Sequence, residues 1–144
     1  MQSEIRLPAR LENLGEFLRH ILSAGREAGL DETALNHLEL CSEEALVNVF
    51  SYAYPEGSGD ALASCREEGG LFLVDIVDSG VPFDATSGPD PDTVSDLSER
   101  NIGGLGIFFI KKLMDEIHYR REDGRNILTL VLKKEGQDRG LLKE

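Results

Sequence analysis

Apolar residues recur with a helical period in two stretches near the start of the chain. Residues 11–28 carry an apolar residue every three or four positions and are followed by Gly29, which predicts one helix with a glycine after its end. The same period runs from Asp31, a suitable N-cap, to the break at Pro55, and predicts a second helix. Its apolar stripe consists of Leu35, Leu38, Leu46, Val49, Phe50 and Ala53.

Alternating and continuously apolar runs predict strands in the rest of the chain. Residues 4–7 alternate and stop at a proline, which is typical of a short edge strand. Residues 60–66 and 71–77 are strand-like and are joined by Glu-Glu-Gly-Gly, which predicts a β-hairpin. Residues 117–122 and 125–133 predict a second hairpin, because Asp-Gly joins them.

The order of these elements indicates the fold class. Residues 81–100 are rich in Asp, Ser, Pro and Gly without any period, and a loop of this length is usually functional or disordered. Residues 107–117 regain the helical period. The order of strand, helix, helix, two strands, loop, helix and two strands predicts an α+β fold in one domain over residues 1–144, with its core at about 4–133. We expect a two-layer sandwich with helices on one face of a mixed, mostly antiparallel sheet.

The composition narrows the class of protein. A chain of 144 residues that is 40% hydrophobic and 29% charged is typical of a soluble globular domain. No apolar run is long enough to span a bilayer, and the first residues lack the pattern of a signal peptide. Cys41 and Cys65 fall on a predicted helix and a predicted strand, so we expect two reduced, packed thiols and a cytoplasmic protein.

The net charge of −12 limits the partners. It argues against direct contact with nucleic acid or with anionic membranes, because both need clustered Lys and Arg. It does not exclude ATP, since Mg²⁺ and backbone N–H groups can hold the phosphates. The acidity also suits a basic face of another protein.

Two polar clusters carry candidate chemistry. Glu44 and Asn48 are four residues apart and project from one helical face, where a carboxylate can act as a base and an amide oxygen can bind magnesium. The same pair is also typical of an exposed helix flank. Asp78 ends an apolar strand and Gly80 permits a tight turn behind it. A carboxylate there can accept a hydrogen bond from the amino group of adenine, although the same residues suit a plain turn.

A third cluster is rich in glycine. Residues 103–106 (Gly-Gly-Leu-Gly) precede the third predicted helix, where free N–H groups and the positive end of the helix dipole favour phosphate. The Walker pattern is excluded because no Gly-Lys-Ser/Thr follows, and the dinucleotide fingerprint because no strand leads directly into the glycines. A flexible hinge has the same composition.

Taken in order, the three clusters resemble the N, G1 and G2 boxes of the GHKL ATPase superfamily. The closest likeness within it is to the anti-sigma-factor serine kinases of bacteria. The likeness rests on residues 43–48 (Glu-Glu-Ala-Leu-Val-Asn), 78–84 (Asp-Ser-Gly-Val-Pro-Phe-Asp) and 104–116 (Gly-Leu-Gly-Ile-Phe-Phe-Ile-Lys-Lys-Leu-Met-Asp-Glu). It extends from about Leu7 to Lys133.

The resemblance implies a role for each matching residue. Glu44 is expected to be the general base that positions an attacking serine hydroxyl, and Asn48 to coordinate Mg²⁺. Asp78 is expected to bind the adenine amino group, and Gly80 to leave room for the base. The remaining ATP-binding positions implied are Arg100 for the γ-phosphate, Gly104, Leu105 and Gly106 for phosphate contacts, and residues 81–100 as the ATP lid.

Two positions depart from the family pattern. The family usually carries Ala-x-x-His-Ala-Tyr after the Asn, whereas this chain has Val-Phe-Ser-Tyr-Ala-Tyr, which places Tyr52 at the histidine position. Arg100 is the only basic residue between Val81 and Ile110, so a cation for the γ-phosphate comes from Arg100 or from elsewhere.

The function implied is that of an ATP-dependent serine kinase that binds ATP or ADP with Mg²⁺. It would phosphorylate an anti-anti-sigma protein and sequester a sigma factor, and family members commonly dimerise. One alternative is a binding module that switches partners with the bound nucleotide but transfers no phosphate, for which the base Glu44 is not needed. Another is the detached catalytic domain of a sensor histidine kinase, which needs a phosphorylated histidine. We instead expect His20, His37 and His118 to be surface or packing residues.

Overall fold

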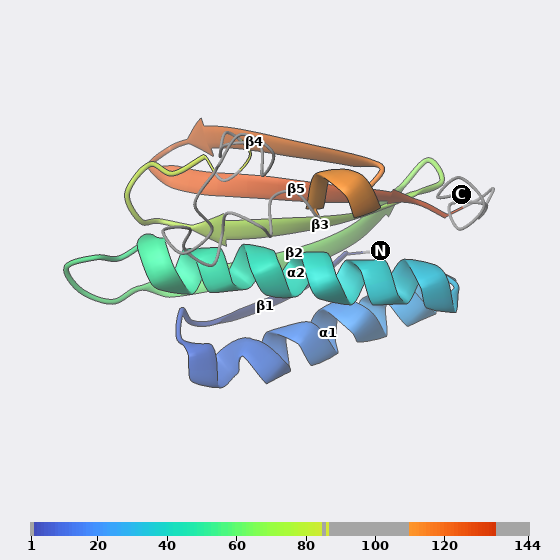
Figure 1. Ribbon diagram of the computed structural model, residues 1–144, viewed down its shortest axis with the longest axis horizontal. Helices are drawn as coiled ribbons and strands as arrows, with labels where there is room; N and C mark the ends of the chain where they lie inside the picture. Colours follow the sequence, from blue (N-terminus) through green and yellow to red (C-terminus); the bar gives the residue numbers. More distant parts are fainter. Residues whose placement is uncertain (1, 85, 87–109, 135–144) are drawn as a thin grey trace, which may run out of the picture.

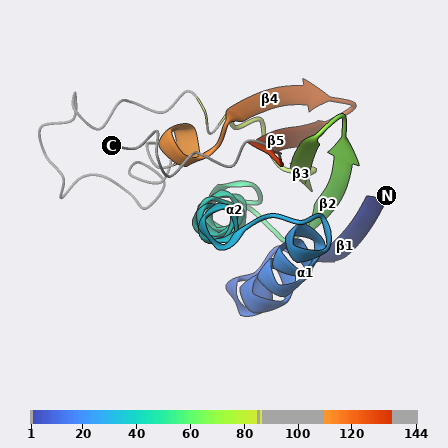
Figure 2. The same cartoon turned by 90° about the vertical axis from the view of Figure 1, so that its right-hand side faces the viewer.

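The computed structural model describes residues 2–84, 86 and 110–134, and in this part the fold is an α+β sandwich of two layers. Helices α1 and α2 lie on the same concave side of a five-stranded sheet (Figures 1 and 2). The predicted fold class is confirmed. The elements are β1 (Gln2–Pro8), a 3₁₀ turn η1 (Leu11–Asn13), α1 (Leu14–Glu27), α2 (Glu32–Tyr52), β2 (Asp60–Glu68), β3 (Leu71–Asp78), β4 (Glu116–Glu122) and β5 (Arg125–Lys133).

The sheet has the strand order β1-β2-β3-β5-β4. All four pairings between these described strands are antiparallel, so the parallel pairs of a mixed sheet do not occur among them. The last strand, β5, lies between β3 and β4, and β4 lies at the edge of the sheet. This order brings the end of β3 next to the start of β5, although about fifty residues separate them in the chain.

The two helices follow the sequence prediction closely. The predicted first helix is divided into the 3₁₀ turn and α1, which begins at Leu14. Asp31 caps α2 as expected, because its side chain accepts a hydrogen bond of 2.8 Å from the backbone N–H of Ala34. Within the described residues, no helix combines the length and the apolar character that crossing a membrane requires.

The helix predicted over residues 107–117 is wrong at its C-terminal end. In its described part the helix covers only residues 110–113, and β4 begins at Glu116. Asp115 explains the early end, because its N–H donates to the carbonyl of Val131 and its carboxylate accepts from the N–H of Lys133. Ile117, whose spacing suited either period, belongs to the strand.

Both hairpins close through two-residue turns with positive φ. Asp123 and Gly124 have φ values of 53° and 75°, as expected from the Asp-Gly pair. Gly69 and Gly70 have φ values of 50° and 84°, so β2 extends to Glu68, two residues further than predicted.

The hydrophobic core fills the space between the sheet and the two helices. It is mainly aliphatic and aromatic at its centre, where the largest side chains are fully buried. These include Phe17 and Ile21 of α1, Leu38 and Leu46 of α2, and Phe72, Ile76, Leu130 and Leu132 of the sheet.

Candidate functional site

Strand register places three polar side chains in one row across the end of the sheet. Asp78, the last residue of β3, is paired with Asn126 of β5, which is in turn paired with Arg121 of β4. Paired residues point to the same face of a sheet, and here that face is covered by α2. The next row consists of Ile76, Leu128 and Tyr119.

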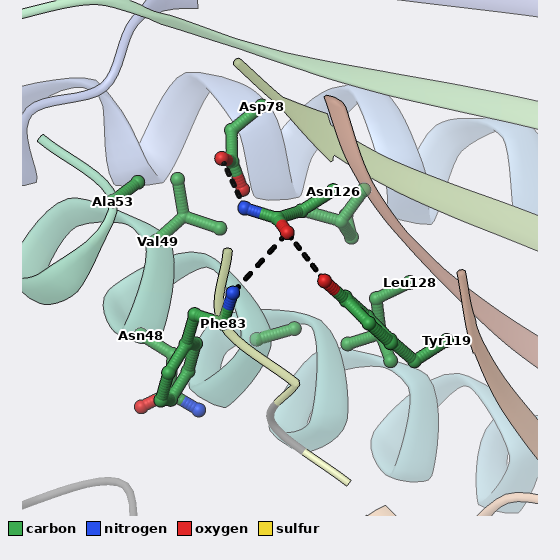
Figure 3. Close-up of a pocket in the computed structure, with 10 residues that line it drawn as sticks. Asn48, Val49, Ala53, Asp78, Phe83, Tyr119, Asn126 and Leu128 are labelled. Carbon is green, nitrogen blue, oxygen red and sulfur yellow. Dashed lines mark hydrogen bonds between the residues drawn. The ribbon is translucent and has the colours of Figure 1, made fainter. Parts of the chain in front are cut away.

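A pocket lies between these two rows and α2 (Figure 3). One end of it is formed by Asn48 on the helix, and the other by Asp78 and Asn126 at the strand ends. The predicted ligand residues Asn48 and Asp78 therefore line the same cavity. The complete lining consists of Ala45, Asn48, Val49, Ala53, Ile76, Asp78, Phe83, Tyr119, Asn126 and Leu128.

Asp78 is 5% exposed, and among the described residues its hydrogen bonds use one of its two carboxylate oxygens. Oδ1 accepts hydrogen bonds from the N–H of Gly80 at 2.8 Å and from Nδ2 of Asn126 at 2.9 Å. Oδ2 has no donor among the described residues. The turn and the binding interpretations are thus compatible, because Oδ1 stabilises the turn and Oδ2 is left for a ligand.

Close packing against α2 also requires a glycine at position 80, in addition to the turn predicted from the sequence. A Cβ at this position would lie 2.1 Å from the carbonyl oxygen of Ala53, at the C-terminal end of α2. The next residue, Val81, donates its N–H to the same carbonyl at 2.9 Å. The absence of a side chain therefore allows the end of β3 to pack directly on α2, which fixes the distance between the two sides of the pocket.

Asn126 is the principal residue that sequence analysis missed. It is 5% exposed, and its Nδ2 donates to Asp78 Oδ1 and, at 2.8 Å, to the carbonyl of Val81. Its Oδ1 accepts from the hydroxyl of Tyr119 at 2.6 Å, from Arg121 Nη1 at 3.1 Å and from the N–H of Phe83 at 3.3 Å. The available signal was an amide side chain at the start of an otherwise apolar strand, just after a two-residue turn.

Asn48 and Glu44 are not an exposed flank of α2. Asn48 is 2% exposed, and neither its oxygen nor its nitrogen has a hydrogen-bond partner among the described residues. Glu44 is half-buried, and its Oε2 is buried and also without a partner there. Burial raises the pKa of Glu44 above its ordinary value of 4.5, and the neighbouring charge of Glu43 raises it further.

Two further tyrosines lie beside residues of the pocket. Tyr52, at the position where the family usually has histidine, contacts Phe83 with ring centroids 5.3 Å apart. The hydroxyl of Tyr54 donates to the carbonyl of Asp60 and accepts from the N–H of Ser79, directly beside Asp78. Burial is the main cause that raises the pKa of Tyr54.

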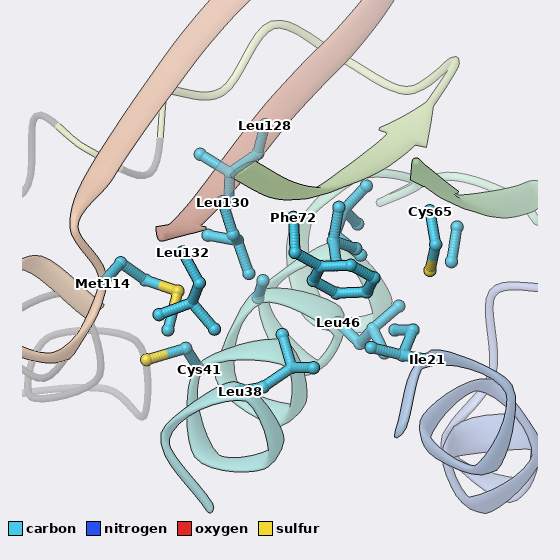
Figure 4. Close-up of a cluster of buried hydrophobic side chains, with 14 of the residues drawn as sticks. Ile21, Leu38, Cys41, Leu46, Cys65, Phe72, Met114, Leu128, Leu130 and Leu132 are labelled. Carbon is cyan, nitrogen blue, oxygen red and sulfur yellow. The ribbon is translucent and has the colours of Figure 1, made fainter. Parts of the chain in front are cut away.

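Neither cysteine forms a disulfide and both are buried, which confirms two packed thiols. They lie at opposite ends of the core, Cys41 near Met114 and Cys65 beyond Phe72 (Figure 4). Burial raises the pKa of each thiol to about 12, with smaller contributions from Glu44 at Cys41 and from Asp75 at Cys65. At neutral pH neither thiol is an activated nucleophile.

Several predicted positions fall outside the described residues. These are Arg100, Gly104, Leu105, Gly106 and the greater part of the lid at residues 81–100, so their assigned roles stay predictions. None of the three histidines lines the pocket. His20 shares a hydrogen bond with Ser3, and His118 with Glu116, as suits packing or surface residues.

Comparison with known proteins identifies the family. The model of the histidine kinase-like ATPase domain matches residues 7–132. The chain is 33% identical over 95 residues to the serine/threonine-protein kinase BtrW of Bordetella bronchiseptica, covering 65% of this chain and 67% of that protein. It is 30% identical over 148 aligned positions to the serine-protein kinase RsbW of Bacillus licheniformis, covering 95% of this chain and 89% of the relative.

Solved structures agree on the fold. The histidine kinase domain of the blue-light activated kinase EL346 from Erythrobacter litoralis superposes with a TM-score of 0.55 at 19% identity. The match covers 91% of this chain but 65% of that domain, so the chain spans less than two thirds of this structural neighbour. By sequence and by fold, the chain belongs to the histidine kinase-like ATPase family of the GHKL type, and within it resembles the RsbW serine-protein kinases.

Proposed function

We propose that the pocket between α2 and the ends of β3 and β5 binds ATP or ADP together with Mg²⁺. One observation carries this proposal: at both ends of a single pocket, polar side-chain atoms have no partner among the described residues. Both atoms of the Asn48 amide are buried at one end, and Oδ2 of Asp78, a residue that is 5% exposed, stands at the other. Buried polar groups are normally hydrogen-bonded, so unpaired ones at a cavity wall are suited to a ligand.

The two ends suit the two ends of a nucleotide. The carboxylate of Asp78 can accept a hydrogen bond from an amino group such as that of adenine. The side-chain oxygen of Asn48 is a hard oxygen ligand of the type that Mg²⁺ binds, usually alongside phosphate oxygens. When bound, Mg²⁺ neutralises charge on the phosphates. In this proposal Gly104, Leu105, Gly106 and Arg100 hold the phosphates, and residues 81–100 form the lid.

Glu44 supports a transfer reaction in addition to binding. It lies one helical turn before Asn48, on the same face of α2, and its raised pKa brings the carboxylate closer to the basicity that a general base needs. Glu44 accepts the proton of a serine hydroxyl, whose oxygen forms the new bond to the γ-phosphorus as the bond to the leaving ADP breaks. A switch without transfer has no use for this residue.

The proposed acceptor is a serine on an anti-anti-sigma protein, and the proposed second partner is a sigma factor. The support for this is the likeness to RsbW and BtrW, whose names describe them as protein kinases. A homodimer in the cytoplasm is proposed on the same family likeness. The domain is proposed to comprise residues 1–144.

Calorimetric titration of Mg-ATP and Mg-ADP into the purified protein tests the site. Asp78→Asn should weaken binding by on the order of 1.5–3 kcal/mol, since it removes a charge-assisted hydrogen bond. Asp75→Asn is the matched control, because Asp75 lies on the opposite face of the same strand and bonds Thr129. Binding by neither nucleotide to the folded protein, or equal loss in both variants, would refute the proposed site.

A further inference from the structure

The amide of Asn126 has one chemically possible orientation. The N–H of Phe83 and the guanidinium of Arg121 can only donate, so the side-chain atom that they face must be the oxygen. The carbonyl of Val81 can only accept, and so can the ionised carboxylate of Asp78, so the atom that they face must be the nitrogen. The surrounding groups therefore exclude the flipped amide.

In this orientation Asn126 has no hydrogen left to offer to a ligand. Both hydrogens of Nδ2 are used by Asp78 and Val81. The hydroxyl hydrogen of Tyr119, the other polar group on this side of the pocket, is used by Oδ1. Toward a bound molecule, this end of the pocket thus presents acceptors: Asp78 Oδ2 and the lone pairs of the Tyr119 hydroxyl.

We propose that Asn126 is the positioning residue that makes the pocket select an adenine over a guanine base. It holds Asp78 by one oxygen so that the other faces the ligand, and it consumes the donors that a guanine would need. This inference rests on the proposed nucleotide site and adds its base specificity. Asn126 acts through Asp78 and does not itself have to touch the base.

The two purines differ in the group that would meet Asp78. Adenine carries an amino group at position 6, which donates to a carboxylate, whereas guanine carries a carbonyl oxygen there, which is repelled by it. A site built from satisfied, directional hydrogen bonds rejects a ligand of the wrong polarity strongly, because buried groups are then left unpaired. Specificity therefore depends on the carboxylate keeping its charge and its orientation.

The charged and titratable side chains that contact Asn126 come from two strands. Arg121 and Tyr119 come from β4, and Asp78 from β3. The part of α2 that lines the pocket contributes no titratable side chain. Replacing the amide by a carboxyl group would place two carboxyl groups at hydrogen-bond distance, and such a pair shares a proton. The shared proton supplies a hydroxyl donor, which the described residues at the strand end of the native pocket do not offer.

The test is the affinity of Asn126→Asp for Mg-ATP and for Mg-GTP, measured by calorimetry beside the native protein. We expect ATP binding to weaken by about tenfold or more, while GTP binding is unchanged or stronger, so that the preference for ATP shrinks. Asn36→Asp, the same change at an exposed position of α2, should alter neither affinity. A merely structural role of Asn126 would weaken both nucleotides equally.

A second variant covers the case in which Asn126→Asp does not fold. Tyr119→Phe keeps the ring that lines the pocket and removes only the shortest hydrogen bond to Oδ1. It should weaken ATP binding by about two- to fivefold with GTP binding unchanged. An undiminished preference for ATP in the folded variants would overturn the role of Asn126 alone. Failure of the native protein to bind ATP would overturn the proposed function, and this inference with it.

Discussion

The two ends of the pocket differ in whether their buried amide side chains are hydrogen-bonded. At the strand end, Asn126 is buried and every hydrogen-bonding atom of its side chain is used, by groups from β3, β4 and the segment after β3. At the helix end, Asn48 is even less exposed, yet both atoms of its amide lack partners among the described residues. The same residue type is thus satisfied at one end and unsatisfied at the other.

This difference indicates which part of the site is rigid and which part is completed by a ligand. A fully satisfied network in a low-dielectric environment fixes the geometry of its members. An unpaired buried amide costs free energy, and it is tolerated where function compensates for it. In the proposed nucleotide site, the strand end would therefore be preorganised for the base, and the helix end would be completed by the metal and phosphates.

The largest expected effect is on catalysis at the helix end. Glu44→Gln should lower phosphate transfer from radiolabelled ATP to an anti-anti-sigma protein by about 10²- to 10⁴-fold, the usual contribution of a general base. The affinity for ATP should change little. Glu43→Gln is the matched control, because Glu43 is adjacent and exposed. Full transfer by Glu44→Gln would exclude this residue as the base.

The comparison itself is tested by the same substitution at both ends. Asn126→Leu should lower the free energy of unfolding by about 2–4 kcal/mol, because it leaves several buried groups unpaired. Asn48→Leu should leave it unchanged or raise it by about 1 kcal/mol, because it removes two atoms that were already unpaired. Urea denaturation of both ligand-free variants measures the difference. Equal destabilisation would show that the two ends are not distinct.

A smaller loss of stability is expected when one hydroxyl group is removed from the hydrogen-bond network around Asn126. Tyr119→Phe should lower the free energy of unfolding by about 0.5–1.5 kcal/mol, since it removes the hydrogen bond to Asn126. Tyr52→Phe serves as the control, because no hydrogen bond among the described residues involves the Tyr52 hydroxyl. Thermal denaturation of both variants at one pH would reveal the contrast, and a similar loss in both would contradict it.

The pH dependence of stability should be the mildest difference. Because the pKa of Glu44 is raised in the folded protein, the folded state holds this proton more tightly than the unfolded chain does. The contribution of Glu44 to stability is therefore present below 4.5 and falls as the pH rises through the higher folded value. Relative to Glu44→Gln, the native protein should lose stability in urea titrations as the pH rises above 4.5. A constant difference would contradict the shift.

Local chemistry made much of the fold predictable. The Asp31 cap and the Asp-Gly turn each act within a few residues, and both were confirmed. The predicted end of the third helix was wrong because the spacing of Ile117 suits a helix as well as a strand. The helix ends earlier because the chain pairs with β5, where the N–H of Asp115 donates to the carbonyl of Val131. This contact joins distant parts of the chain.

The site was only partly predictable for the same reason. The candidates Glu44, Asn48 and Asp78 were proposed from local motifs whose order along the chain is specific, and Asn48 and Asp78 line one pocket. Asn126 was missed because its role depends on its register opposite Asp78, which no neighbouring residue encodes. The two-residue turn alone would have paired it with Arg121, but not with β3.

The placement of the tyrosines gives the protein an optical signal of its own. The chain has no tryptophan and only three tyrosines, so these dominate its fluorescence and much of its near-ultraviolet spectrum. Tyr119 lines the pocket, Tyr52 contacts the lining residue Phe83, and Tyr54 bonds the residue next to Asp78. Light emitted by the whole protein therefore comes from one small region, so tyrosine emission offers a test of the proposed nucleotide binding in unmodified protein, without a dye.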